Sequence, residues 1–218
     1  MNGDPQTQTM AKKMRTKVKI CGIRSIQDGI AAGNLGADAI GLVFYPDSVR
    51  VLEPQQARAI IDAMPPFVKI VGLFMNAMAD EIREIVRSAP VDLLQFHGDE
   101  PADFCRMFEQ PYVKALAMGS GMDVAASTSA YPDAAAVLLD SHMKGHAGGT
   151  GQVFDWSTIP DTLAKPFILA GGLTPDNVVQ AIYAAHPYAV DVSSGVESAP
   201  GVKDVDRMTQ FIHEVNHA

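Results

Sequence analysis

The feature that most constrains the fold is a series of short apolar runs that recurs along most of the chain. Successive runs begin roughly two dozen residues apart, which is the length of one strand, one crossover helix and two loops. Val, Ile, Leu and Ala dominate them, as is typical of buried parallel strands. The runs are VKIC (18–21), AIGLVF (39–44), VKIVGLF (68–74), LLQFH (93–97), YVKALAM (112–118), AAVLLD (135–140), PFILAG (166–171) and AVDVSS (189–194).

Helical patterns fill the intervals between the runs. Residues 53–64 (EPQQARAIIDAM) and 79–89 (ADEIREIVRSA) carry apolar residues at spacings of three and four. Residues 174–185 (TPDNVVQAIYAA) predict a helix with Thr174 as N-cap and Pro175 at the first helical position. Residues 202–217 predict a final amphipathic helix. Strands therefore alternate with helices along the chain.

This alternation predicts a parallel sheet covered by helices on its outer face. For 218 residues, a single (β/α)8 barrel over residues 16–218 is the economical solution. The fifth crossover, residues 121–133 (GMDVAASTSAYPD), has poor helical periodicity and is expected to be irregular. An open doubly wound sheet is the alternative, but no G-x-G-x-x-G follows the first run to support it.

Charge and cysteine content restrict the function. The chain has 17 basic and 25 acidic residues, a net charge of −8, which argues against general binding to nucleic acid or anionic membranes. Cys21 and Cys105 form no disulfide framework, and no apolar stretch is long enough to span a bilayer. The polar residues 1–15 are interpreted as a disordered extension without a secretory signal. We therefore expect a cytoplasmic protein with a small-molecule substrate and no obligate protein partner.

Functional residues of such barrels lie at the carboxyl ends of the strands. Cys21 ends the first strand and Asp140 ends the sixth. Small residues end the last two strands, where backbone N–H groups can approach an anion closely, and together they predict a phosphate site: Gly171, Gly172, Ser193, Ser194 and Gly195. The alternative is that these glycines only permit tight turns. The glycine-rich residues 145–156 are interpreted as a lid or a loop beside the phosphate, against the alternative of a loop without chemical role.

Six motifs in this order carry a resemblance to a known family. KICGI, QFHGDE, LLDS, GGTGQVFDW, ILAGGL and DVSSGVE followed by GVKD resemble the phosphoribosylanthranilate isomerases of tryptophan biosynthesis, from about Val18 to the last helix. The resemblance implies a (β/α)8 barrel that converts N-(5'-phosphoribosyl)anthranilate into 1-(o-carboxyphenylamino)-1-deoxyribulose 5-phosphate. This Amadori rearrangement proceeds by general acid/base catalysis, without a metal or an organic cofactor.

The resemblance also implies roles for individual residues. Asp140 would protonate the furanose ring oxygen as general acid, and Cys21 would remove the C2' proton as general base. These roles predict a raised pKa for Asp140 and a lowered pKa for Cys21 in the substrate complex. Arg50 would bind the anthranilate carboxylate, for which its planar guanidinium is suited. His97 belongs to a matching motif, and it is expected to orient a loop or to contact substrate.

Strand alternation predicts a supporting ion pair. Lys19 and Cys21 are two residues apart and lie on the same face of their strand, so both point into the barrel if Cys21 does. A buried lysine needs a partner. Asp191, on the neighbouring eighth strand, is the candidate, and we predict that it pairs with Lys19 beneath the site.

Two other functions remain open from the residues themselves. Asp140, His97 and His142 at one rim could suggest a metal-dependent sugar-phosphate epimerase on the same barrel, although the second and third strands end in apolar residues that cannot ligate metal. His142 and His146 are otherwise simple loop histidines. A non-catalytic barrel that binds a phosphorylated metabolite is the other alternative, but such a protein needs neither an acid nor a base.

Overall fold

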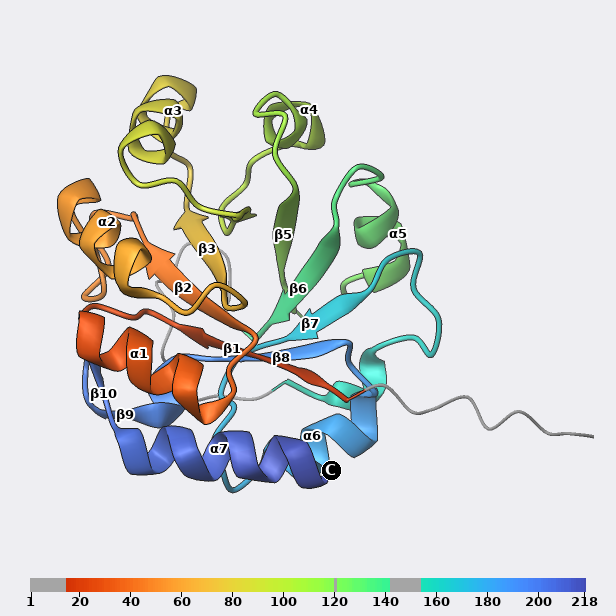
Figure 1. Cartoon of the computed structure of the whole chain (residues 1–218). Helices are drawn as coiled ribbons and strands as arrows, with labels where there is room; N and C mark the ends of the chain where they lie inside the picture. Colours follow the sequence, from red (N-terminus) through yellow and green to blue (C-terminus); the bar gives the residue numbers. More distant parts are fainter. Residues whose placement is uncertain (1–14, 120, 142–153) are drawn as a thin grey trace, which may run out of the picture.

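Eight parallel strands close into one barrel in the order of the sequence (Figure 1). The computed structural model describes residues 15–119, 121–141 and 154–218. Closure confirms the predicted (β/α)8 fold and excludes the open sheet, because the first strand pairs with the last as well as with the second. The expected extension, residues 1–15, lies outside the described residues except for Arg15. The strands are β1 (Lys17–Cys21), β2 (Ala39–Val43), β3 (Lys69–Phe74), β4 (Leu93–Phe96), β5 (Tyr112–Ala117), β6 (Ala136–Asp140), β7 (Phe167–Leu169) and β8 (Ala189–Val192).

Helices surround the barrel on its outside (Figure 1). The chain signals that start and stop them are local: Ser25 Oγ accepts a hydrogen bond from Asp28 N at the start of the first helix, and Gly36 ends that helix with a φ of 101°. The α-helices are α1 (Ile26–Leu35), α2 (Pro54–Ala63), α3 (Ala79–Ser88), α4 (Ala102–Arg106), α5 (Val124–Ser129), α6 (Val178–Ala185) and α7 (Val205–His217). Two 3₁₀ helices, η1 (Trp156–Thr158) and η2 (Ser194–Val196), lie after β6 and β8.

Two crossovers differ from a regular unit. The fifth crossover, expected to be irregular, contains a helix of only six residues, α5, whose first turn is capped by the Asp123 carboxylate on Ala126 N. Ser and Thr make up half of α5, and their side chains bond backbone carbonyls, which disfavours a longer helix. After β6, the described part of the crossover contains η1 and no α-helix.

The predicted start of α6 is wrong by three residues. The N-cap is Asn177 and not Thr174. The Asn177 side chain accepts a hydrogen bond from Thr174 N and donates one to Gly172 O, so residues 172–177 form a turn in place of the first helical turn. The residues after β7 are therefore held as a loop against the barrel end.

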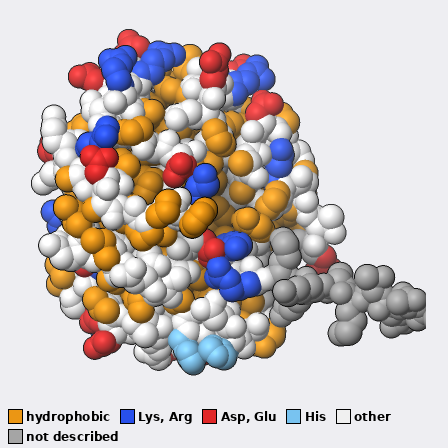
Figure 2. Space-filling model, viewed as in Figure 1, with side chains coloured by type: hydrophobic (Ala, Val, Ile, Leu, Met, Phe, Trp, Pro, Cys, Tyr) orange, Lys and Arg blue, Asp and Glu red, His pale blue; other side chains and the backbone are white. Residues whose placement is uncertain are grey.

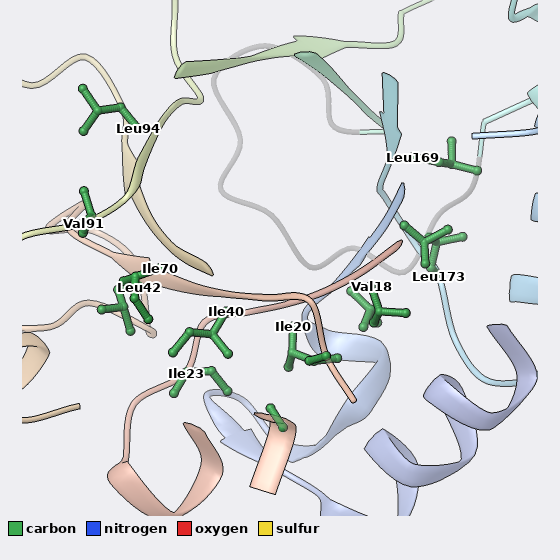
Figure 3. Packing of buried hydrophobic residues seen from close by; sticks show 14 of the residues in the cluster. Val18, Ile20, Ile23, Ile40, Leu42, Ile70, Val91, Leu94, Leu169 and Leu173 are labelled. Atoms are coloured by element: carbon green, nitrogen blue, oxygen red, sulfur yellow. The ribbon is translucent and has the colours of Figure 1, made fainter. Parts of the chain in front are cut away.

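Alternation along the strands divides the core into two layers. One set of side chains points outward and packs under the helices; Val18 and Ile20 of β1 and Ile40 and Leu42 of β2 lie on this side of their strands (Figure 3). The other set fills the barrel interior, and its apolar members are small or branched: Val113, Ala115, Ala136, Leu138, Ile168, Ala170 and Ala189. Nearest the carboxyl ends, this inner side of the barrel carries the polar residues Cys21, Gln95, Asp140 and Asp191 together with the apolar Val43 and Leu73, and these residues line the site described below.

A small hairpin follows β8 and was not predicted. It consists of β9 (Glu197–Ala199) and β10 (Val202–Lys203), which pair antiparallel beside η2 and lead into α7. Gly201 makes the turn with a φ of 77°, a conformation that favours glycine. The hairpin sits beside the last strand, so its side chains can reach the carboxyl ends of the barrel (Figure 1).

The outer surface carries charges of both signs. Basic side chains are mixed with acidic ones on the face shown in Figure 2. Within residues 15–119, 121–141 and 154–218, no helix is both long and apolar enough to cross a membrane.

Candidate active site

One pocket at the carboxyl ends of the strands collects most of the predicted site residues. Most of its lining comes from positions at or just beyond a strand end, because those side chains converge where the barrel opens, and the loop after β2 adds residues up to Arg50. Two predicted residues lie outside the lining: Lys19 is one interior layer below Cys21, and Gly171 precedes the lining residue Gly172. The predicted residues that line the pocket are Cys21, Arg50, His97, Asp140, Gly172, Asp191, Ser193, Ser194 and Gly195.

Cys21 lies buried at the end of β1, facing the interior. It pairs in register with Gly41 of β2, and an added Cβ at Gly41 would lie only 2.7 Å from Cys21 Sγ. A larger residue would therefore displace the sulfur. Below it, Lys19 Nζ lies 2.9 Å from Asp191 Oδ1, and both side chains are almost fully buried. The ion pair predicted from strand alternation is thus present.

The charges around Cys21 act in opposite directions. Burial raises the pKa of the Cys21 thiol, while the cationic Lys19 and Lys203 lower it and the Asp191 carboxylate raises it; the balance in the free protein is a raised pKa. The lowered pKa was predicted for the substrate complex, and the free protein has the opposite shift. For Lys19, burial disfavours the cation, but the Asp191 carboxylate and the Cys21 sulfur outweigh burial and leave its pKa raised. Lys19 therefore remains a cation beside the sulfur.

Asp140 ends β6, and its carboxylate lies at one end of a row of polar side chains that continues through His97 to Gln95 of β4. The His97 Nε2 atom lies 3.4 Å from Asp140 Oδ2, and Gln95 Nε2 lies 2.9 Å from His97 Nδ1. With the Gln95 amide donating to Nδ1, a neutral His97 carries its proton on Nε2 and presents it to Asp140. His97 therefore contacts the predicted acid, a more specific position than the loop or substrate contact expected from the sequence.

Arg50 reaches the pocket from the loop between β2 and α2, and part of its guanidinium is already hydrogen-bonded within the protein. Its Nε and Nη2 atoms donate to Glu197 Oε1 and Oε2, both at 2.7 Å. The hydrogen bonds to Glu197 raise the pKa of Arg50, so the guanidinium stays charged. The family resemblance predicts that Arg50 binds a substrate carboxylate. The structure adds a second carboxylate, that of Glu197, on one side of the guanidinium.

Glu197 is the centre of a buried network on the hairpin. Besides Arg50, its carboxylate accepts from Lys203 Nζ at 2.8 Å and from Gly201 N at 3.1 Å. Burial opposes its ionisation, yet the bonds from Arg50 and Lys203 prevail and lower its pKa to about 2. Lys203 Nζ also donates to Ser193 O at 3.0 Å, which ties the hairpin to the end of β8.

The predicted phosphate residues form two adjacent backbone turns. Gly171 and Gly172 have φ values of 84° and 67°, and a Cβ at Gly171 would collide with Ser141. Across from them, a Cβ at Gly195 would collide with the carbonyl oxygen of Leu173. No hydrogen bond of the Gly172 or Gly195 N–H groups is found among the described residues. The positive φ values and the collisions show that both turns require glycine. Both turns border the pocket, into which these N–H groups could donate.

The remaining histidines, the glycine-rich loop and Cys105 do not contribute to the pocket as described. The glycine-rich residues 145–153, His142 and His146 lie outside the described residues. Within the described part of the chain, no three His, Cys, Asp or Glu side chains are grouped as metal ligands. Cys105 on α4 is fully buried, and burial raises its pKa to about 12, so its thiol stays protonated and serves packing.

Sequence reasoning missed Glu197, Lys203 and Gln95. The family motif that ends in GVE contains Glu197, but Glu197 belongs to no periodic strand or helix pattern that would indicate burial. Lys203 falls within residues 202–217, for which the sequence predicts the final helix. That helix begins only at Val205, and Lys203 lies on β10 instead. Gln95 had a usable signal, because it lies two residues before His97 on β4 and must share its interior face.

Comparisons with known proteins agree with this geometry. The family model for N-(5'phosphoribosyl)anthranilate (PRA) isomerase matches residues 18–214. An N-(5'-phosphoribosyl)anthranilate isomerase of Pseudomonas fluorescens is 56% identical over 200 residues, covering 92% of this chain and 95% of the relative. One of Pseudomonas aeruginosa is 53% identical over 199 residues, covering 91% and 94%.

Solved structures give the same result. The phosphoribosyl anthranilate isomerase of Thermotoga maritima has a TM-score of 0.85 at 38% identity and covers 93% of this chain and 100% of its own. Another such isomerase, solved in complex with reduced 1-(o-carboxyphenylamino)-1-deoxyribulose 5-phosphate, has a TM-score of 0.82 at 37% identity with the same coverage. The chain therefore belongs to the N-(5'-phosphoribosyl)anthranilate isomerase family.

Proposed function

We propose that Cys21 and Asp140 perform the two proton transfers by which this isomerase converts N-(5'-phosphoribosyl)anthranilate into 1-(o-carboxyphenylamino)-1-deoxyribulose 5-phosphate in tryptophan biosynthesis. The reaction needs an acid and a base that face different atoms of one sugar. The observation that carries the proposal is that the two side chains, on β1 and β6, line the same pocket while two strands, β7 and β8, lie between β6 and β1 on the shorter way around the barrel. An acid and a base on separate walls can address the ring oxygen and C2' at once.

The proposed chemistry has two stages. Asp140 delivers a proton to the furanose ring oxygen, the C1'–O bond breaks, and a protonated Schiff base forms between C1' and the anthranilate nitrogen. Cys21, as thiolate, then removes the C2' proton, and the electrons of that C–H bond form the enolamine. Tautomerisation of the enolamine gives the ketone product. No electrons are exchanged with any other group, so the reaction requires no redox cofactor, and Asp140 and Cys21 supply both proton transfers without a metal.

The two ends of the substrate have separate candidate partners. The phosphate is proposed to bind the backbone N–H groups at Gly171, Gly172, Ser193, Ser194 and Gly195, where close approach is possible and no side chain interferes. The anthranilate carboxylate is proposed to bind Arg50. Lys19 and Asp191 support Cys21 from below, and His97 contacts Asp140. In this proposal residues 16–218 act as one catalytic domain.

A cytoplasmic location without an obligate protein partner completes the proposal. Both cysteines are free, which fits a reducing compartment. Separation of cell fractions followed by detection of the protein tests the location.

Turnover of freshly generated substrate, followed by the change in anthranilate fluorescence, tests the function in a buffer with a metal chelator. Wild type is expected to react rapidly, whereas Cys21→Ser and Asp140→Asn each lose at least about 100-fold in kcat. Cys105→Ser is the matched control, because it makes the same change in a buried thiol outside the pocket, and it should keep kcat near the wild-type value.

Three results would contradict the proposal. Activity that disappears with the chelator and returns with a divalent metal would favour the metal-dependent alternative. Ligand binding without any turnover would favour a binding protein. Full activity of Cys21→Ser would remove the thiol from the base role while leaving the family membership intact.

A further inference from the structure

The Arg50 guanidinium is already gripped on one side by a carboxylate of the protein. Glu197 accepts from Nε and Nη2 in two parallel bonds of 2.7 Å. A guanidinium has five N–H groups, and this fork uses one on Nε and one on Nη2. The Nη1 and Nη2 groups at the opposite edge remain, and no other hydrogen bond of the guanidinium is found among the described residues. A second carboxylate can therefore bind end-on while Glu197 keeps the side-on edge.

The charge balance of the network fits one further carboxylate. Arg50 and Lys203 each carry one positive charge and Glu197 carries one negative charge, so the three groups together have a net charge of +1. All three side chains are largely buried, with exposed fractions of 12% for Arg50, 4% for Glu197 and 0% for Lys203. A buried excess charge favours an anion of one negative charge at the edge of Arg50 that no described residue occupies.

The hairpin fixes Glu197 independently of any ligand. Gly201 N donates to Oε2 across the β9–β10 turn, and Lys203 Nζ donates to Oε1. The stem of Arg50 packs closely over Gly22 as well, because a Cβ on Gly22 would lie only 2.4 Å from Arg50 Cδ. Gly22 directly follows Cys21, so the guanidinium is locked at a fixed place beside the end of β1.

We propose that Glu197 is the positioning residue for substrate carboxylate recognition: it holds Arg50 by the side-on edge and presents the end-on edge to the anthranilate carboxylate. This inference rests on the proposed role of Arg50. Glu197 touches no substrate atom and acts through Arg50 alone. It thereby sets the affinity for ligands that carry the carboxylate, and not the affinity for the sugar phosphate.

The substitution Glu197→Gln tests the inference because it removes the charge and one acceptor while it keeps the shape of the side chain. The remaining carbonyl oxygen can still accept from Lys203, while the new NH₂ group faces the donors Arg50 Nη2 and Gly201 N. The fork is lost and the shape is kept. Affinities are measured by calorimetry for two ligands: reduced 1-(o-carboxyphenylamino)-1-deoxyribulose 5-phosphate, and the same molecule with an unsubstituted phenyl ring. The ratio of their dissociation constants is the carboxylate selectivity.

We expect Glu197→Gln to lower the carboxylate selectivity by about tenfold or more, because a charge-assisted fork is no longer held in place. The dissociation constant of the phenyl ligand should stay within about threefold of wild type. In turnover, KM should rise more than kcat falls. The control is Glu84→Gln, the same change on an exposed position of α3, which should leave the selectivity unchanged.

The outcomes separate the inference from the function on which it rests. Unchanged selectivity in Glu197→Gln, with lowered selectivity in Arg50→Met, overturns the positioning role and leaves the role of Arg50 standing. Unchanged selectivity in Arg50→Met overturns the role of Arg50 itself. Equal weakening of both ligands by Glu197→Gln also overturns the inference. If Glu197→Gln does not fold, Glu197→Asp replaces it in the test. The aspartate retains the negative charge, but it is one methylene too short to make both hydrogen bonds to Arg50. Unchanged carboxylate selectivity in Glu197→Asp then overturns the positioning role of Glu197.

Discussion

Gly41 gives the sharpest prediction about how the fold places the proposed base. An alanine Cβ at this position would lie 2.7 Å from Cys21 Sγ and 3.1 Å from both Cys21 Cα and Lys19 Nζ. Ordinary contacts begin near 3.4 Å, so the sulfur must move by about 0.7 Å. A displacement approaching 1 Å from the reacting geometry costs about 100-fold in rate. We therefore expect Gly41→Ala to lower kcat by about 100-fold.

The assay separates chemistry from binding and from folding. KM and the affinity for the reduced product analogue should change less than about threefold, because neither end of the substrate contacts Gly41 in the proposal. Gly119→Ala is the control, since an added Cβ there meets no atom of the described residues within 4 Å. A folded Gly41→Ala variant with wild-type kcat would refute the reasoning, because the position of the thiol would then not limit the rate.

Two further predictions concern buried charges. Lys19→Met leaves Asp191 buried without its partner and should lower the free energy of unfolding by about 3–5 kcal/mol in urea titrations. Loss of the cation also raises the pKa of Cys21, so the ascending limb of the plot of kcat/KM against pH should move to higher pH. An ascending limb at the wild-type pH would contradict this prediction. Glu197 has a folded-state pKa of about 2, below the ordinary glutamate pKa of 4.5, so its stabilisation is present above pH 4.5 and is lost as the pH falls toward 2. Between pH 5 and 3.5 wild type should lose about 1 kcal/mol more than Glu197→Gln, and parallel pH profiles of the two proteins would refute the assignment.

The barrel was predictable because its signals are local and repeated. Buried parallel strands give apolar runs, and their spacing leaves room for one helix each. Lys19 and Asp191 could be paired before any coordinates, because alternation fixes the face of Lys19 and barrel closure makes β8 the neighbour of β1. The start of α6 could not be predicted in the same way, since the Asn177 side chain competes with a helical first turn that Thr174 and Pro175 would otherwise favour.

Contacts that depend on short or distant segments escaped prediction. The hairpin of β9 and β10 has strands of three and two residues, too short for any periodicity, so the burial of Glu197 had no visible signal. The approach of His97 to Asp140 crosses β5, and the sequence states only that both residues end strands. The pKa of Cys21 depends on the sum of burial and three nearby charges, which only coordinates supply.

The most direct test of the central claim is a crystal structure of the protein with reduced 1-(o-carboxyphenylamino)-1-deoxyribulose 5-phosphate. The account predicts Cys21 Sγ within about 3.5 Å of C2', Asp140 on the side of the oxygen that closes the furanose ring, and the phosphate on the two glycine turns. The carboxylate should lie on the Nη1 and Nη2 edge of Arg50. A ligand seated in the pocket with C2' more than about 5 Å from Cys21 Sγ, beyond the range for direct proton transfer, would contradict the account.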